Sequence, residues 1–268
     1  MAALAYRHQK VQRLRRLVGR RSARQAERAF VAEGAKVVAE ALDGAGSVEA
    51  IFVDPAAAGP ADLVVVERAF AAGCRVFELE KGVLERVAGT VTPQAVLAIV
   101  AAVDVGLGVL ARDGVIVVCA DVRDPGNLGT VLRSAEAAAV RGVVCTEGTV
   151  DPYNPKCVRA SAGALFHVPL VFGGNTVQVL GELGTWGLRR LGTSARSGDP
   201  LWDTDLSGPL ALVLGNEASG LAPEVDAVLD GHVRIPIEGR AESLNVGMAA
   251  AVLVYEAARQ RQAGGAQA

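Results

Sequence analysis

The chain has 268 residues, of which 51% are hydrophobic, with a mean hydropathy of +0.31 and a formal net charge of −2. This length favours two modest domains, and the apolar content is too high for a disordered chain. No uncharged run reaches 18 residues and the arginine-rich N-terminus lacks the apolar segment of a secretory signal, so we expect a cytoplasmic protein without membrane association.

Residues 1–36 are strongly basic. They hold eight arginines and two lysines against two glutamates, a net charge of +8, which leaves −10 for the rest of the chain. A basic arm on an acidic body is typical of proteins that bind a polyanion, although a solvated arginine-rich helix has the same composition. As candidate RNA contacts we take Arg13, Arg15, Arg16, Arg20 and Arg21.

Helices and strands alternate in the first block of the chain, which we take as an α/β domain over 1–103. The small residues that follow predict a linker over 104–111. Apolar spacing predicts helices over 4–18, 25–42, 62–72 and 81–88, and strands over 51–53, 75–77 and 95–103.

The second block, 112–268, has the pattern of a parallel α/β sheet. Its run 115–120 is continuously apolar, as in a strand buried on both faces. Strands that alternate with helices favour parallel pairing. We predict strands over 115–120, 143–145, 188–192, 210–214 and 233–235, helices over 128–140 and 244–261, and helix, strand and helix around 155–184.

Three loops at predicted strand ends combine glycine with small polar and charged residues. In open α/β sheets, ligands bind at the carboxyl ends of strands. The loops carry NLGTVLR at 127–133, GNEASGL at 215–221 and PIEGRAESLN at 236–245. Glycine lets a ligand approach the backbone, and we expect Asn127 at the helix cap with Arg133 near the same face.

Each of these residues also has a purely structural interpretation. Asn127 and Ser243 could serve only as helix caps, Arg133 could pair with Glu136 three residues on, and Glu217 could stabilise a helix start. The presence of three such loops in one domain favours a ligand site.

Several other chemistries lack their motifs. The sequence has no GxxxxGK[ST] or GxSxG motif, and its three histidines are in no triad-like setting. A GxGxxA match at 106–111 is followed at once by Asp113 and Gly114, which end any helix there. The four cysteines show no CxxC pair or metal-ligand spacing, so we expect buried thiols and no metal site.

The three loops resemble the motifs of the SpoU/TrmH family of RNA ribose 2′-O-methyltransferases, part of the SPOUT superfamily. The matching segments are NLGTVLRSA at 127–135, LVLGNEASGL at 212–221 and IPIEGRAESLNV at 235–246. The segment 24–41, with FVAEG at 30–34, is similar to the L30e-like substrate-binding domain that many members carry.

This resemblance implies a C-terminal SPOUT-type parallel sheet with a deep trefoil knot, preceded by the smaller L30e-like α/β domain. It also implies S-adenosylmethionine as cofactor, RNA as substrate and a homodimer whose active site draws on both chains. The implied cofactor-binding residues are Thr193, Ser194, Leu214, Gly215, Asn216, Ile235, Leu244 and Asn245. The implied catalytic residues are Arg133, Asn127, Glu217, Ser243 and Asn245.

The role of Arg133 and the choice of RNA stay open at this point. Arg133 either removes the proton of the 2′-hydroxyl or stabilises the forming alkoxide as a cation, because arginine rarely deprotonates. The L30e-like domain favours 23S rRNA over tRNA. A SPOUT-type base methyltransferase and a non-catalytic RNA- or ribosome-binding protein on the same fold are the alternatives.

Overall fold

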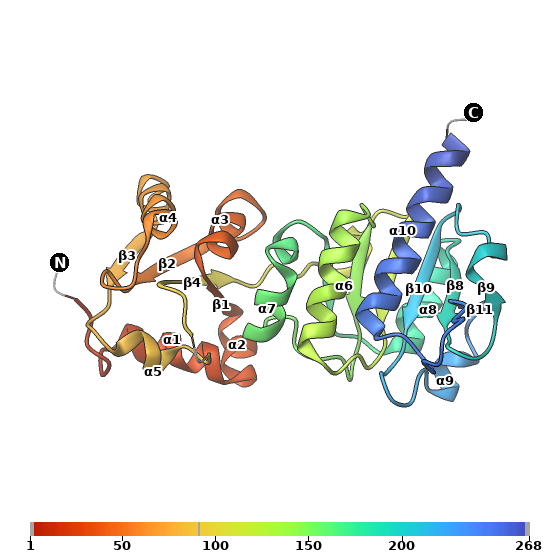
Figure 1. Ribbon diagram of the computed structural model, residues 1–268, viewed down its shortest axis with the longest axis horizontal. Helices are drawn as coiled ribbons and strands as arrows, with labels where there is room; N and C mark the ends of the chain where they lie inside the picture. Colours follow the sequence, from red (N-terminus) through yellow and green to blue (C-terminus); the bar gives the residue numbers. More distant parts are fainter. Residues whose placement is uncertain (1–2, 91, 266–268) are drawn as a thin grey trace. The chain divides into compact units, whose positions relative to one another are not determined.

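The computed structural model describes residues 3–90 and 92–265, which form two compact units (Figure 1). The first unit comprises residues up to 103 together with 153–167. The second comprises 104–152 and the chain from 168 onward. No helix in the described part of the chain has the length and apolar character needed to cross a membrane.

The first unit is built on a four-stranded sheet of order β1-β4-β2-β3. Both β1 and β2 pair antiparallel with β4, and β3 pairs parallel with β2. Val11, Leu14 and Leu17 of α1 recur on one helical face and are buried in this unit's core. The elements are α1 (Gln9–Gly19), α2 (Arg21–Glu27), β1 (Ala29–Glu33), α3 (Ala35–Asp43), β2 (Val48–Val53), α4 (Pro60–Ala71), β3 (Arg75–Glu78), α5 (Val83–Val87), β4 (Val96–Ala101), α7 (Pro155–Ser161) and η2 (Ala164–Phe166).

The predicted single helix over 25–42 is wrong. Arg28 adopts a left-handed conformation with φ of 49° and ends α2, and the next five residues form strand β1. All five are buried and pair with β4 from Ala29 to Ala101 through Glu33 to Leu97. Sheet pairing and burial of this apolar segment therefore override the helical spacing of the surrounding sequence.

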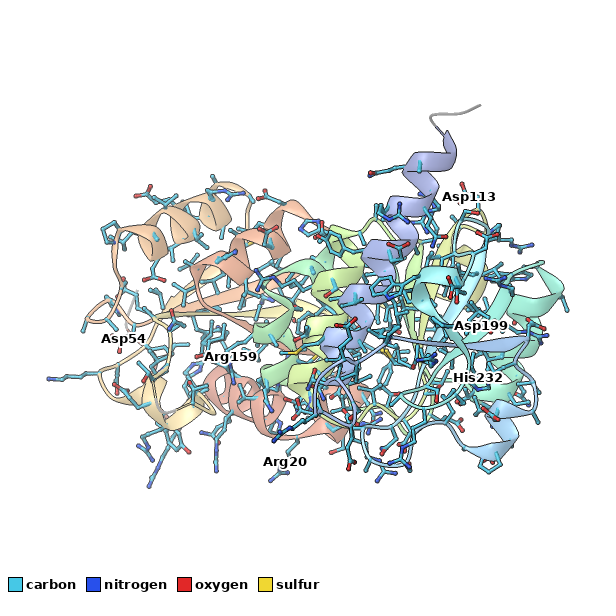
Figure 2. All side chains as sticks on the ribbon, turned by 45° about the vertical axis from the view of Figure 1, so that its right-hand side comes forward. Arg20, Asp54, Asp113, Arg159, Asp199 and His232 are labelled. Atoms are coloured by element: carbon cyan, nitrogen blue, oxygen red, sulfur yellow. The ribbon has the colours of Figure 1, made fainter. Side chains whose placement is uncertain are left out.

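Residues 153–167 belong to the first unit although they follow β6 of the second in sequence. The ring of Phe30 stacks on Tyr153, with centroids 4.7 Å apart, and on Phe166 at 6.0 Å. The buried Glu33 carboxylate accepts a hydrogen bond of 2.9 Å from Arg159, which Figure 2 labels, and others from Thr90 and the Gln94 backbone. The domain predicted over 112–268 includes this segment, so its boundary differs here from that of the second unit.

The second unit contains a seven-stranded sheet of order β7-β6-β5-β10-β8-β11-β9, in which every neighbouring pair is parallel. This confirms the predicted parallel α/β sheet. The elements are η1 (Leu107–Val109), β5 (Val115–Cys119), α6 (Pro125–Ala137), β6 (Gly142–Cys145), β7 (Leu170–Phe172), α8 (Thr176–Thr185), β8 (Arg189–Thr193), β9 (Asp199–Pro200), η3 (Leu201–Asp203), β10 (Leu210–Leu214), α9 (Pro223–Asp226), β11 (Gly231–Arg234) and α10 (Val246–Gly265).

Strand β10 enters the sheet between β5 and β8, although both precede it in sequence. It pairs with β5 from Leu210 opposite Val115 to Leu214 opposite Cys119, and every residue of both strands is buried. The strand order changes direction here, which is where open α/β sheets bind ligands. The carboxyl ends of β5, β8, β10 and β11 consequently meet along one edge.

Helices α6 and α10 pack side by side in the second unit (Figure 1). A Cβ at Gly247 would lie only 2.9 Å from Cβ of Thr130, so the helix backbones approach closely. Ala250, Leu253 and Val254 of α10 are buried. This contact fixes the start of α10 beside the start of α6.

We predict that Arg159→Ala lowers the free energy of unfolding of the first unit by about 3 kcal/mol, because it leaves the Glu33 carboxylate buried without its ion-pair partner. Hydrogen exchange of the β1 amides measures this locally. The control is Arg68→Ala, whose partner Asp43 is exposed, and it should cost less than about 1 kcal/mol. Equal destabilisation of the two variants would contradict a structural role for the Arg159–Glu33 pair.

Candidate functional site

A cleft of about 1340 Å³ opens along the edge where β5, β8, β10 and β11 end. Its walls are three polar loops: the start of α6, the loop after β10 and the segment between β11 and α10. The loop after β8 closes a further side. The predicted site residues that line the cleft are Asn127, Thr193, Ser194, Gly215, Asn216, Glu217, Ile235, Ser243, Leu244 and Asn245.

A chain of side-chain hydrogen bonds joins the three polar loops. Nδ2 of Asn245 donates to Oδ1 of Asn127 at 2.8 Å, and Nδ2 of Asn127 donates to Oε1 of Glu217 at 2.9 Å. Oδ1 of Asn245 accepts from the backbone N–H groups of Gly247 and Met248, so Asn245 caps α10. This cap determines which end of the Asn245 amide faces Asn127.

Glu217 is held at the beginning of α6. Its carboxylate accepts backbone hydrogen bonds of 3.2 Å from both Arg123 and Asp124. Burial raises the pKa of the Glu217 carboxyl, but the hydrogen bonds from Asn127 and from the backbone of Glu217, Arg123 and Asp124 outweigh this effect and lower it. The residue therefore stabilises a helix start, as one structural interpretation suggested, while it also lines the cleft.

The predicted helix-cap position of Asn127 is wrong. Asp124 is the N-cap of α6, and its carboxylate accepts from the backbone N–H of Asn127 at 2.9 Å. The side chain of Asn127 is thereby left to bond Glu217 and Asn245. Ser243 does not cap α10 either, because Asn245 does so.

The loop after β10 is tightly closed. The backbones of Asn216 and Gly220 exchange hydrogen bonds of 2.9 and 3.0 Å. A Cβ at Gly215 would lie 2.5 Å from the carbonyl carbon of Gly220, so only glycine fits that approach. In the loop after β8, Oγ of Ser194 accepts from the backbone N–H groups of Arg196 and Ser197.

Arg133 and Leu214 do not line the cleft. Leu214 is buried in β10, and Arg133 is exposed on α6. Six residues along a helix turn a side chain through roughly 600°, which leaves positions 127 and 133 about 120° apart. No ion pair joins Arg133 to Glu136 within the described residues.

The five candidate RNA contacts belong to α1, α2 and the residue between them in the first unit. Arg13 is bound by Glu27 at 2.5 Å and by Glu49 at 2.8 Å, and the Glu49 carboxylate raises its pKa. Arg16 lies 3.7 Å from Glu27. Arg15 and Arg21 are exposed, and Arg20 projects outward in Figure 2. The acidic partners therefore neutralise part of the arm.

Sequence reasoning missed several residues around the cleft. Asp121, Arg123 and Asp124 all follow β5, and their position at a strand end was the available signal. His232, labelled in Figure 2, bonds Asp226 at 2.6 Å, and both residues line the cleft without any recognisable sequence motif. No cluster of metal-binding side chains occurs in 3–90 or 92–265.

The cleft suits a cofactor with an adenosine group and an amino-acid tail. Gly215, Ile235 and Leu244 line it, together with apolar residues such as Leu221 and Val233 and small hydroxyl residues. Backbone amides and small side chains are what a closely held nucleoside requires. The residues present therefore fit S-adenosylmethionine.

Comparison with known proteins places both units in described families. Residues 114–255 match the SpoU rRNA Methylase family, and residues 8–98 match the MRM3-like substrate binding domain. The chain is 34% identical to the 23S rRNA (guanosine(2553)-2′-O)-methyltransferase RlmP of Bacillus subtilis, over 84% of this chain and 87% of the relative.

Solved structures resemble the chain over nearly its whole length, and two of them contain the cofactor. The SpoU methyltransferase AviRb from Streptomyces viridochromogenes, in complex with the cofactor AdoMet, has a TM-score of 0.84 at 27% identity over 96% of this chain and 99% of its own. An AdoMet-bound rRNA methyltransferase from Sinorhizobium meliloti has a TM-score of 0.80 at 29% identity over 94% of this chain and 95% of its own.

We predict that Glu217→Gln destabilises the second unit at neutral pH but not in acid. A lowered pKa stabilises the folded state above the unfolded pKa and loses that effect as the pH falls through the folded value. The melting-temperature gap between wild type and variant should be largest above pH 4.5 and should close below it. Glu242→Gln is the control, because Glu242 has only a 3.9 Å contact with exposed Arg196. A gap independent of pH would refute this account.

Proposed function

Because the chain belongs to the SpoU rRNA methylase family, we propose that it transfers a methyl group from S-adenosylmethionine to a ribose 2′-hydroxyl of 23S rRNA in the cytoplasm. The observation that carries this proposal is the Asn245–Asn127–Glu217 chain, which joins all three family motifs around one cleft. The named activity of the Bacillus relative supports 23S rRNA as the substrate.

The transfer requires the ribose oxygen and the methyl donor to be held in line. The bound cofactor supplies an electrophilic methyl group. Backbone groups of Gly215, Ile235 and Leu244 would hold it, and Thr193 and Ser194, which also line the cleft, would contact its adenine. Such alignment supplies up to about 7–11 kcal/mol of a displacement barrier.

The chain's polar residues orient the ribose. Asn127 has both ends of its amide engaged by Asn245 and Glu217, so its orientation is set before substrate arrives. Ser243 is exposed at the cleft and offers its hydroxyl. Arg133 either accepts the 2′-hydroxyl proton or stabilises the alkoxide that forms when the proton leaves.

We propose a homodimer, because Arg133 is exposed outside the cleft of its own chain. The spacing of Val246, Ala249, Leu253, Val254 and Ala257 also forms an apolar stripe along α10, but Leu253, Val254 and Ala257 are buried within the chain itself. A different stripe on α10 is exposed: Met248, Val252 and Tyr255, at spacings of four and three. These apolar side chains support a contact between two copies that brings Arg133 to the partner's cleft.

The order of the strands supports the expected trefoil knot. Strand β10 lies between β5 and β8, and β11 lies between β8 and β9, so each of these late strands enters between two that precede it in sequence. A knotted chain would be an exception to the rule that connections do not thread through one another.

Mapping 2′-O-methylation in the 23S rRNA and tRNA of a deletion strain and its parent tests the proposed function. We expect one ribose methylation in 23S rRNA to disappear and to return on complementation. A methylation lost only from tRNA would show that tRNA, not 23S rRNA, is the substrate. An unchanged methylation map in both RNAs would overturn the proposal.

Subunit mixing tests the shared site. Arg133→Ala should lower turnover about a hundredfold or more while the affinity for cofactor is unchanged. Asn127→Ala should inactivate the cleft of the chain that carries the substitution. In a 1:1 mixture, random pairing makes about half of the dimers mixed. Each mixed dimer holds one complete site, formed by the intact cleft of one chain and Arg133 of the other, so activity should recover to about a quarter of wild type. No recovery in verified mixed dimers would show that each chain uses its own Arg133.

The RNA-binding arm is tested by two variants that remove equal charge. Arg15→Ala with Arg20→Ala should weaken rRNA binding and flatten its salt dependence by about 0.7–0.9 in log K against log salt for each phosphate that is no longer neutralised. Arg13→Ala with Arg16→Ala should change the slope less, because Glu27 and Glu49 already engage these arginines. Equal slopes for the two variants would indicate that only the net charge of the arm matters.

A further inference from the structure

Asp121 has an unusual backbone conformation directly after the central strand β5. Its φ is 66°, and among the described residues only Arg28, Ala139 and Ala162 share a positive φ without being glycine. This left-handed region suits glycine best, and aspartate and asparagine adopt it more readily than other residues because their short polar side chains bond locally. Asp121 is outside the lining of the cleft, so no direct contact with a ligand explains why an aspartate stands there.

The left-handed turn directs two oxygen atoms of Asp121 toward the same amide. Nδ2 of Asn216 donates to the backbone carbonyl oxygen of Asp121 and to its Oδ2, at 3.1 Å each. The other carboxylate oxygen, Oδ1, accepts from Nε of Arg123 at 2.9 Å. Both partners, Asn216 and Arg123, line the cleft.

Asn216 in turn shapes the loop after β10. Its Oδ1 accepts from the backbone N–H groups of Ala218 at 2.9 Å and Ser219 at 3.2 Å. An amide reversed end for end would place its oxygen against the two oxygens of Asp121 and its N–H groups against two N–H donors. The contacts of Asp121 therefore decide which end of the Asn216 amide faces the loop.

We propose that Asp121 is a positioning residue that holds Asn216, and through it the loop 215–220, in the shape that binds S-adenosylmethionine. This inference rests on the proposed function, which assigns the loop to the cofactor. A glycine at position 121 would relieve the backbone conformation but would remove the carboxylate that Asn216 and Arg123 bond. Asp121 thus accepts the left-handed backbone and also supplies the carboxylate that orients Asn216.

Two substitutions separate positioning from simple turn formation. Asp121→Gly should leave the melting temperature unchanged or raised, yet weaken S-adenosylmethionine binding about tenfold in calorimetry, as expected for the loss of an orienting hydrogen bond. Asp121→Asn tolerates the left-handed conformation and keeps an oxygen for Asn216, so its affinity should stay within about twofold of wild type. Asn216→Ala should weaken binding as much as Asp121→Gly, and the double variant no more.

Ala139→Gly is the matched control, because Ala139 has a φ of 52° in the same unit and does not line the cleft. Its cofactor affinity should equal that of wild type. Amide hydrogen exchange at Ala218 and Ser219, measured without cofactor, should accelerate in Asp121→Gly and stay unchanged in Asp121→Asn and in the control.

Unchanged exchange and affinity in Asp121→Gly would overturn the proposal, as would an Asp121→Asn variant as weak as Asp121→Gly. If wild type bound no S-adenosylmethionine, the proposed function would fail. The exchange rates would still decide whether Asp121 positions the loop.

Discussion

The parallel pairing of β5 with β10 is the constraint on which the cleft depends. Its register places Leu214 opposite Cys119. The ladder of backbone hydrogen bonds continues one residue further, where the N–H of Ala120 donates to the carbonyl of Leu214 at 2.8 Å. Two residues further along each strand, Asp121 and Asn216 stand side by side. Segments about a hundred residues apart in sequence are thus aligned by strand pairing before any ligand contributes, and a slip of register would separate every polar contact that follows.

The parallel sheet was predictable because its central strands are continuous apolar runs that end at glycine or acidic residues. A strand buried on both faces does not alternate between apolar and polar residues. Helices that connect such strands favour parallel pairing, because each helix returns the chain to the same end of the sheet. The cleft followed from the same reasoning, since parallel strands bring their carboxyl ends to one edge. The loops that carry Asn127, Glu217 and Asn245 were identified in this way, whereas the roles of the three residues came from the family resemblance. The structure brings their side chains into one hydrogen-bonded chain.

Features decided by distant contacts were not predictable. Residues 29–33 have neighbours with helical spacing, and only pairing with β4 and the stack of Phe30 on Tyr153 makes them a strand. The left-handed turn at Asp121 likewise has no local signature, because its reason lies across the sheet at Asn216.

The inclusion of residues 153–167 in the first unit has a consequence for biosynthesis. The ribosome synthesises the first 103 residues before Tyr153, Arg159 and Phe166. Until those residues emerge, Phe30 lacks its two stacking partners and Glu33 lacks its ion-pair partner. The unit is completed only after β5, α6 and β6 have left the exit tunnel. The first unit therefore cannot be completed before part of the second unit has been synthesised, and its uncovered apolar surface is exposed to aggregation during that interval.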